Sequence, residues 1–179
     1  MRTTQYSVTK EPQGEDYRKL LGLAVDFCET FSLVLRPGES TQKPRVQLVE
    51  EGRRVLDSLA PSLLSKQKVY SWPGTEILGQ EPDAALLYTY RLSLESVEIL
   101  TTTSKGLYDW QQPRLPEDPC FYLPGGEVWL ATIAHEGDAF IRLTGEMKLL
   151  IERELPQLEL VADVYRDGQW WSALIDEEE

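Results

Sequence analysis

The stretch PCFYLPGGEVWLATIAHEGDAFIRLTGEMKLLIEREL, from Pro119 to Leu155, decides the fold of this chain. Runs of β-branched and aromatic residues flank the Gly125-Gly126 pair, a pattern typical of a β-hairpin, because glycine adopts the positive φ that a tight turn requires. A short acidic connection, a third strand and a helix follow. The stretch therefore predicts an antiparallel meander with a helix that returns over the sheet.

The position of the turn predicts the register of this hairpin. If Gly125 and Gly126 are the two turn residues, Pro124 lies opposite Glu127, and counting outward places Cys120 opposite Ala131. His135 then lies beyond the paired ladder. We therefore expect no direct contact between Cys120 and His135 unless a β-bulge shifts the pairing.

The rest of the chain interleaves helices with strands. Four segments place apolar residues at helical spacing, beginning near Glu15, Pro44, Ser93 and Thr144. Strand composition marks three earlier runs and a second hairpin, at residues 30–36, 66–72 and 84–92 and at Asp167-Gly168. Because no regular βαβ rhythm appears, the fold class is α+β, with a mainly antiparallel sheet packed by about four helices. The apolar run 84–92 is expected in the middle of this sheet, covered on both faces.

A chain of 179 residues is long enough for one domain with its own core. We expect residues 1–14 to form a flexible arm, residues 15–175 a single α+β domain, and residues 176–179 an acidic tail. The N-terminus has no apolar signal segment, and no uncharged run exceeds eight residues, whereas a membrane span needs about 20. These features predict a cytoplasmic protein with no membrane association.

The two cysteines, Cys28 and Cys120, lie far apart and belong to no metal-binding motif. We expect buried free thiols, with a single disulfide between them as the alternative. One histidine and two separated cysteines do not make a zinc site, and no phosphate-binding glycine loop is present. The prediction is therefore no metal and no cofactor.

Acidic residues are concentrated in the second half of the chain. The formal net charge is −12; residues 1–90 carry 11 basic and 12 acidic side chains, whereas residues 91–179 carry 7 and 18. Such a field repels nucleic-acid phosphates and attracts a basic protein. The charge predicts a basic partner and argues against nucleic acid.

The sharpest local feature is a convergence of ionisable groups around the lone histidine. In an antiparallel hairpin the start of one strand lies beside the end of the next, so Glu117 and Asp118 should approach His135 and Glu136, with Asp138 at the same end of the sheet. We expect an acidic patch with a histidine at its edge, suited to an arginine or lysine of a partner. A glycosidase-like carboxylate pair is the alternative chemistry.

The five tryptophans divide into two groups. Trp129 lies within a strand run and is expected in the core, and one of Trp170 and Trp171 must point away from the other. Trp72 and Trp110 occur in proline-containing turns, where we expect them to be partly exposed. An exposed tryptophan beside carboxylates has the composition of a protein-binding hot spot.

Three functional hypotheses remain. The first is a non-enzymatic acidic binding module, such as an immunity or inhibitor protein for a basic partner, which uses the residues Trp72, Trp110, Glu117, Asp118, His135, Glu136 and Asp138. The second is a small hydrolase in which His135 acts as a general base with neighbouring carboxylates such as Asp118 and Glu136. The third is a subunit that completes a homodimer. We expect His135 to be a hydrogen-bonded structural residue, and the first hypothesis is preferred because no catalytic motif is present.

Overall fold

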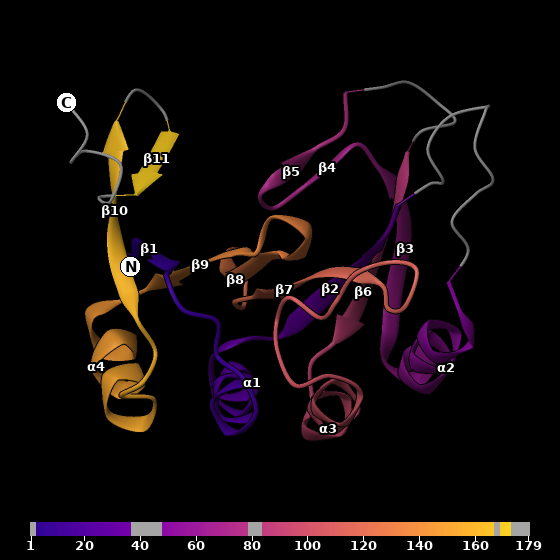
Figure 1. Cartoon of the computed structure of the whole chain (residues 1–179), viewed down its shortest axis with the longest axis horizontal. Coiled ribbons are helices and arrows are strands. Elements are labelled where there is room, and N and C mark those ends of the chain that lie inside the picture. The colour runs from indigo at the N-terminus through magenta and orange to yellow at the C-terminus, as the bar shows by residue number, and fades with distance from the viewer. Residues whose placement is uncertain (1–2, 37–47, 79–83, 167–168, 173–179) are drawn as a thin grey trace.

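A computed structural model describes residues 3–36, 48–78, 84–166 and 169–172, with the backbone alone for residues 165–166 and 169–172. The described strands form one antiparallel sheet of nine and a separate two-stranded hairpin, and four α-helices lie on one face of the large sheet (Figure 1). This architecture confirms the α+β class with a mainly antiparallel sheet.

The large sheet has the strand order β11-β10-β1-β9-β8-β7-β2-β6-β3. Its strands are β1 Thr4–Val8, β2 Thr30–Leu35, β3 Leu63–Val69, β6 Ala85–Arg91, β7 Glu117–Tyr122, β8 Val128–Ile133, β9 Asp138–Leu143, β10 Leu160–Arg166 and β11 Gln169–Ser172. The small hairpin comprises β4 Ser71–Trp72 and β5 Thr75–Glu76, and it lies on the face opposite the helices (Figure 1). The helices are α1 Glu15–Phe27, α2 Glu50–Leu59, α3 Leu94–Thr103 and α4 Gly145–Glu154, and two 3-10 turns are η1 Ala60–Ser62 and η2 Ala134–Glu136.

The meander β7-β8-β9 followed by α4 matches the prediction, and Cys120 lies opposite Ala131 as expected. Near the turn the expected register is wrong. Leu123 N donates to Glu127 O, so the loop contains Pro124 as well as the two glycines, and the pairing shifts by one residue between Phe121 and Tyr122. A three-residue hairpin loop does not require the primed turn that a two-residue loop favours. The β-bulge between Phe121 and Tyr122 accommodates the one-residue change in register.

Two expectations about the placement of strands are wrong. Residues 4–8 belong to strand β1, which pairs with β9 on one side and β10 on the other, so they are not part of a flexible arm. The polar side chains that suggested an arm have buried partners, because Gln5 Nε2 donates to Asp163 Oδ2 at 3.0 Å. The apolar strand β6 lies next to the edge strand β3, and β8 occupies the middle of the sheet.

The core lies between the sheet and the helices. In α1 the residues that the helical spacing selected, Tyr17, Leu20, Leu21 and Ala24, are all buried. The largest fully buried side chains include Trp129, as expected, and also Trp110. Cys28 and Cys120 are free thiols and buried. No described helix has the length and apolar character needed to cross a membrane.

Several expected features fall partly or wholly outside the described residues. Helix α2 begins at Glu50, and its expected start at Pro44 is not described. The strands of the second hairpin pair as predicted, with Tyr165 opposite Trp170, while the turn residues 167–168 and the tail 176–179 are not described.

The start of α3 is fixed by a reciprocal pair of hydrogen bonds. Ser93 Oγ accepts from Ser96 N at 3.2 Å, and Ser96 Oγ accepts from Ser93 N at 2.9 Å. Together they satisfy two backbone donors that the first helical turn leaves without an intrahelical partner. Because Ser96 is buried, water cannot replace its contact.

Substitution Ser93→Ala removes this cap and should lower the free energy of unfolding by about 1 kcal/mol, measured by urea titration. The matched control is Ser58→Ala on the exposed face of α2, which should be neutral or slightly stabilising because alanine has the higher helix propensity. Equal stabilities of the two variants would contradict the role of the cap.

Candidate functional site

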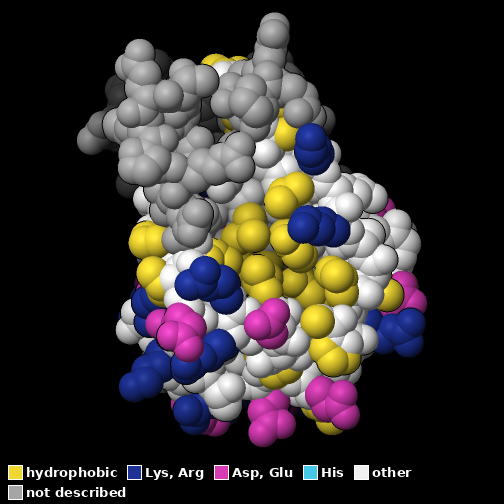
Figure 2. Space-filling view, turned by 90° about the vertical axis from the view of Figure 1, so that its right-hand side faces the viewer, with side chains coloured by type: hydrophobic (Ala, Val, Ile, Leu, Met, Phe, Trp, Pro, Cys, Tyr) yellow, Lys and Arg dark blue, Asp and Glu magenta, His cyan; other side chains and the backbone are white. Residues whose placement is uncertain are grey.

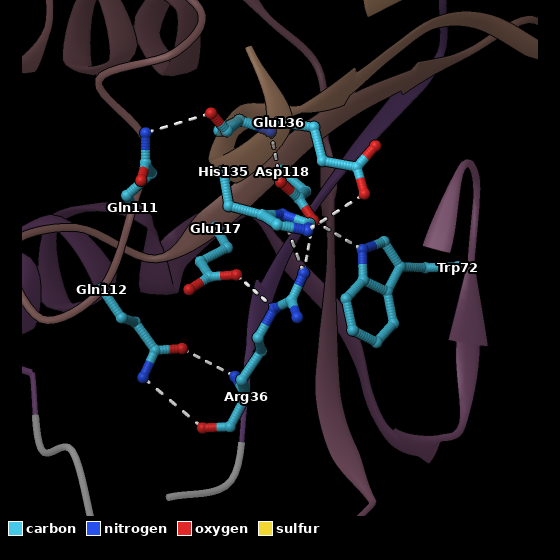
Figure 3. A network of polar contacts seen from close by, with 9 residues as sticks. Arg36, Trp72, Gln111, Gln112, Glu117, Asp118, His135 and Glu136 are labelled. Atoms are coloured by element: carbon cyan, nitrogen blue, oxygen red, sulfur yellow. Dashed lines mark hydrogen bonds and ion pairs between the residues drawn. The ribbon is translucent and has the colours of Figure 1, made fainter. Parts of the chain in front are cut away.

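Side chains from four separate parts of the chain meet at the open end of the β7-β8 hairpin (Figure 3). They are Arg36 after β2, Trp72 of β4, Glu117 and Asp118 at the start of β7, and His135 of η2. One ligand atom from each of Glu117, Asp118 and His135 lies within 4.8 Å of the others. The structure thus brings together the three residues that hairpin geometry places at this end of the sheet.

Arg36 supplies, from within the chain, the cation that the sequence suggested a partner would bring. Its Nε contacts Glu117 Oε2, and a terminal nitrogen lies 3.6 Å from Asp118 Oδ2. The Arg36 side chain is 29% exposed, whereas those of Glu117 and Asp118 are 10% and 0% exposed. The buried pair of carboxylates is therefore occupied by the protein's own guanidinium and is not an open acidic patch.

Asp118 is the best-connected member of this cluster. Its Oδ2 accepts from Trp72 Nε1 at 2.8 Å and its Oδ1 accepts from Ala134 N at 2.8 Å. Its backbone has φ +53°, a left-handed conformation that aspartate tolerates better than most residues. The pairing of β2 with β7 is irregular at this point, between Ser32 and Val34. Asp118 thus joins β4 and η2 to the large sheet.

The pKa of the Glu117 carboxyl reflects three effects that act in opposing directions. Burial raises the pKa of its carboxyl above the ordinary value, Arg36 lowers it, and the negative charge of Asp118 raises it again. The balance leaves the pKa raised. The positive charge of Arg36 therefore stabilises the ionised form of Glu117 and partly offsets the effect of burial on its pKa.

His135 lies at the surface end of the cluster. Its Nδ1 is 3.1 Å from a terminal nitrogen of Arg36, which can only donate, so Nδ1 accepts and the ring proton lies on Nε2. Nε2 faces Glu136 Oε1 at 3.5 Å. With 38% of its side chain exposed, His135 connects the buried ion pair to the solvent-exposed turn between β8 and β9.

The expectation that Trp72 is partly exposed is wrong, because the side chain is 6% exposed. Its ring lies under the Arg36 guanidinium, with Cζ 5.0 Å from the ring centroid. The turn that follows packs closely on the sheet: a Cβ at Gly74, which has φ +83°, would lie 2.5 Å from Ile133 Cδ1. Pro73, which suggested an exposed turn, instead belongs to the β4-β5 hairpin, and this hairpin packs against the large sheet.

Trp110 is also not available at the surface. It is fully buried, and its Nε1 donates to the Tyr17 hydroxyl at 3.1 Å. The irregular segment around it supports the site from the side, because Gln111 Nε2 donates to Ala134 O at 3.0 Å and Gln112 Oε1 accepts from Arg36 N at 2.6 Å. The side chains of Trp170 and Trp171 are not described.

Arg36, Gln111 and Gln112 are the site residues that the sequence did not reveal. Nothing in their local pattern distinguishes them. Arg36 reaches the site through strand order, because β2 lies beside β7 and the residue that follows β2 therefore lies near the start of β7. Gln111 and Gln112 reach it through tertiary hydrogen bonds to Ala134 and Arg36. The turn Pro37-Gly38 after Arg36 indicated a strand end and nothing more.

The site has a buried layer, formed by Arg36, Glu117 and Asp118, and an outer layer, formed by Glu136 and Asp138. The two layers differ in how their charges are paired. Glu136 is 59% exposed and Asp138 is exposed, and no described lysine or arginine forms an ion pair with either. Burial, followed by the negative charges of Asp138 and Glu11, raises the pKa of the Tyr108 hydroxyl to about 12. The site and the adjoining residues therefore carry four carboxylates, of which Glu117 and Asp118 contact the Arg36 guanidinium.

The chemistry open to the buried layer is limited by its existing contacts. Glu117, Asp118 and His135 have the donor types of a metal site, but the Arg36 guanidinium makes contacts with all three. Cys120 is 2% exposed, and burial raises the pKa of its thiol to about 12, so the nucleophilic thiolate is scarce at neutral pH. The buried layer is best described as an ion-paired clamp between strands.

No protein-family model, curated protein or solved structure matches this chain. We therefore infer its function from the contacts and charges of the site itself.

Substitution Arg36→Met keeps most of the side-chain volume but leaves two buried carboxylates without a cation. We expect a loss of about 3 kcal/mol in the free energy of unfolding, because removing one partner of a buried ion pair leaves the other charge buried and uncompensated. The control Arg18→Met removes an exposed arginine of α1, whose side chain is 61% exposed, and should cost less than about 0.5 kcal/mol. A loss equal to that of the control would show that Arg36 does not stabilise the site.

The raised pKa of Glu117 has a definite sign in the dependence of stability on pH. Between the ordinary carboxyl pKa of 4.5 and the raised native value, the folded state binds more protons than the unfolded state, so stability falls as the pH rises through this window. Glu117→Gln should remove that loss, so the stability of the variant relative to the wild type should increase as the pH rises above 4.5. Urea titrations across this range test the prediction, and a pH-independent difference would contradict it.

Proposed function

We propose that this protein is a non-enzymatic binding module that recognises a basic protein partner through the exposed layer of the site, with an immunity or inhibitor role as its most concrete form. The observation that carries the proposal is the division of the site into two layers. Arg36 occupies the buried carboxylates, while Glu136 in the β8-β9 turn and Asp138 at the start of β9 have no lysine or arginine partner among the described residues. The exposed carboxylates are the ones a cationic partner can reach.

The clamp contributes to binding by holding this turn in place. Asp118 accepts from the backbone of Ala134, Gln111 donates to the carbonyl of the same residue, and Arg36 bonds His135. A recognition loop that is ordered before binding loses less conformational entropy when the complex forms. The net charge of −12 then favours encounter with a positively charged surface.

A hydrolytic role for His135 has less support. A general base needs an available lone pair, and the only unprotonated ring nitrogen, Nδ1, already accepts from Arg36. The one cysteine on the same hairpin is buried, with its pKa raised by that burial.

A partner captured on the immobilised protein provides the test of this proposal. Its association rate should fall roughly tenfold between low and high ionic strength, because exposed charges steer the encounter and salt screens them. The double substitution Glu136→Gln and Asp138→Asn should reduce the same rate and flatten its salt dependence, measured by surface plasmon resonance.

The matched control is Glu95→Gln with Glu98→Gln on α3, which removes the same charge from another exposed part of the chain. This control should retain most of the association rate. A salt-independent rate, or an equal loss in both double variants, would argue against recognition by the β8-β9 turn.

A further inference from the structure

The single histidine of the chain lies where a change of pH acts on the candidate site. Histidine is the side chain that ordinarily gains or loses a proton between about pH 5 and 8, and this chain contains His135 alone. The face formed by β3 and α2 shows hydrophobic, lysine, arginine, aspartate and glutamate side chains, with no histidine among its described residues (Figure 2). The charges on that face ordinarily stay constant over the same range. Mild acidification is therefore expected to act on the β8-β9 turn and not on that face.

The ring of His135 is tied to the clamp through a nitrogen that must be unprotonated. Nδ1 lies 3.1 Å from a terminal nitrogen of Arg36, and a guanidinium nitrogen can only donate, so the ring is the acceptor (Figure 3). A protonated imidazole carries a hydrogen on both nitrogens and accepts through neither. The hydrogen bond to Arg36 is therefore lost when His135 is protonated.

Charged groups from three parts of the chain surround this ring. Arg36 follows β2, Glu117 and Asp118 begin β7, and Glu136 is the next residue of η2, with Oε1 3.5 Å from Nε2. An oxygen of each β7 carboxylate lies within 4.8 Å of a ring nitrogen of His135. A protonated ring thus faces Arg36 as a second cation, while the carboxylates offer acceptors for its N–H groups. Protonation exchanges the bond to Arg36 for contacts with carboxylates, which requires the ring or the guanidinium to move.

The exposed half of η2 depends on this ring for its attachment to other elements. Among the described residues, the hydrogen bonds that tie η2 to the rest of the fold are made by the Ala134 backbone and by the His135 ring. Ala134 is buried, whereas His135, Glu136 and Gly137 are exposed. Asp138, the further carboxylate at this end, follows at the start of β9, where its backbone lies opposite Ile133. Without the ring contact, Glu136 is held only through its neighbours in the chain.

We propose that His135 is a pH-dependent latch on the β8-β9 turn: the neutral ring fastens η2 to Arg36, and protonation releases η2 and places a positive charge beside Glu136. The two states differ by one hydrogen bond and one charge, a local change of the kind that biases a two-state element. For a cationic partner both changes weaken binding, because the turn loses its order and the added charge repels. This consequence for binding rests on the proposed function, whereas the release of η2 does not.

The release of η2 is measured on the intact protein without a partner. The single histidine gives one set of ring signals, so NMR follows its protonation directly from about pH 8 to about pH 5. Long-range 1H–15N spectra at the upper end should show the ring proton on Nε2. The amide protection factors of Ala134 and Gly137, whose N–H groups bond Asp118 and the Ala134 carbonyl, should fall at least about threefold as the ring is protonated.

Two substitutions at the same position separate the loss of the acceptor from the gain of charge. His135→Gln keeps a neutral side-chain oxygen that can accept from Arg36, so both amides should stay protected over the whole range. His135→Leu has neither an acceptor nor a charge, and both amides should be at least about threefold less protected than in His135→Gln at every pH. The wild type should follow the glutamine variant at the upper end and the leucine variant at the lower end.

Four results would overturn the proposal. They are a ring proton on Nδ1 in the neutral form, unchanged protection while the ring is protonated, equal protection in the two variants, and a His135→Gln variant that keeps the pH dependence of the wild type. The last result would assign the effect to another group, such as Glu117. If His135→Leu does not fold, the wild-type titration and the glutamine variant decide the question. Because no partner enters these measurements, they reject the latch without rejecting the proposed function, and a failed search for a cationic partner does the reverse.

Discussion

The ion pair between Arg36 and the buried carboxylates of Glu117 and Asp118 is the interaction on which the candidate site depends. Two carboxylates with almost no solvent exposure are unfavourable unless a cation and hydrogen-bond donors replace the lost water. Arg36 provides the cation, and Trp72 and the backbone of Ala134 provide donors to Asp118. One charge cluster thereby joins β2, β7, the β4-β5 hairpin and the β8-β9 turn.

This arrangement assigns different roles to the two layers of acidic residues. The buried layer is paired with a cation from within the chain and holds the local backbone in one geometry. The outer layer, Glu136 and Asp138, keeps its charge exposed on a turn that the buried layer positions. His135 lies between them, with Nδ1 toward Arg36 and Nε2 toward Glu136. The proposed recognition of a cationic partner rests on this arrangement, because charged groups that are oriented before a partner arrives lose less conformational entropy on binding.

The two tryptophans that the sequence suggested as binding residues show how tertiary packing changes the role of a side chain. Trp72 and Trp110 both stand in proline-containing segments, which are usually at the surface. Each is nevertheless covered, and each uses its indole N–H for a buried hydrogen bond, to Asp118 and to Tyr17. Burial of each indole ring removes a large apolar area from water, which favours the inward fold of both segments.

The sequence by itself determined the local elements: the α1 helix with its four buried residues, the meander, the opposition of Cys120 and Ala131, the start of a helix near Ser93, and the approach of Glu117 and Asp118 to His135. These depend on periodicity and on contacts within one hairpin. Only the tertiary structure decided that residues 4–8 form an inner strand, that β6 lies near the edge, and that Arg36 fills the acidic pair. Those features depend on which strands become neighbours, and strand order arises from long-range packing that leaves no periodic signal in the chain.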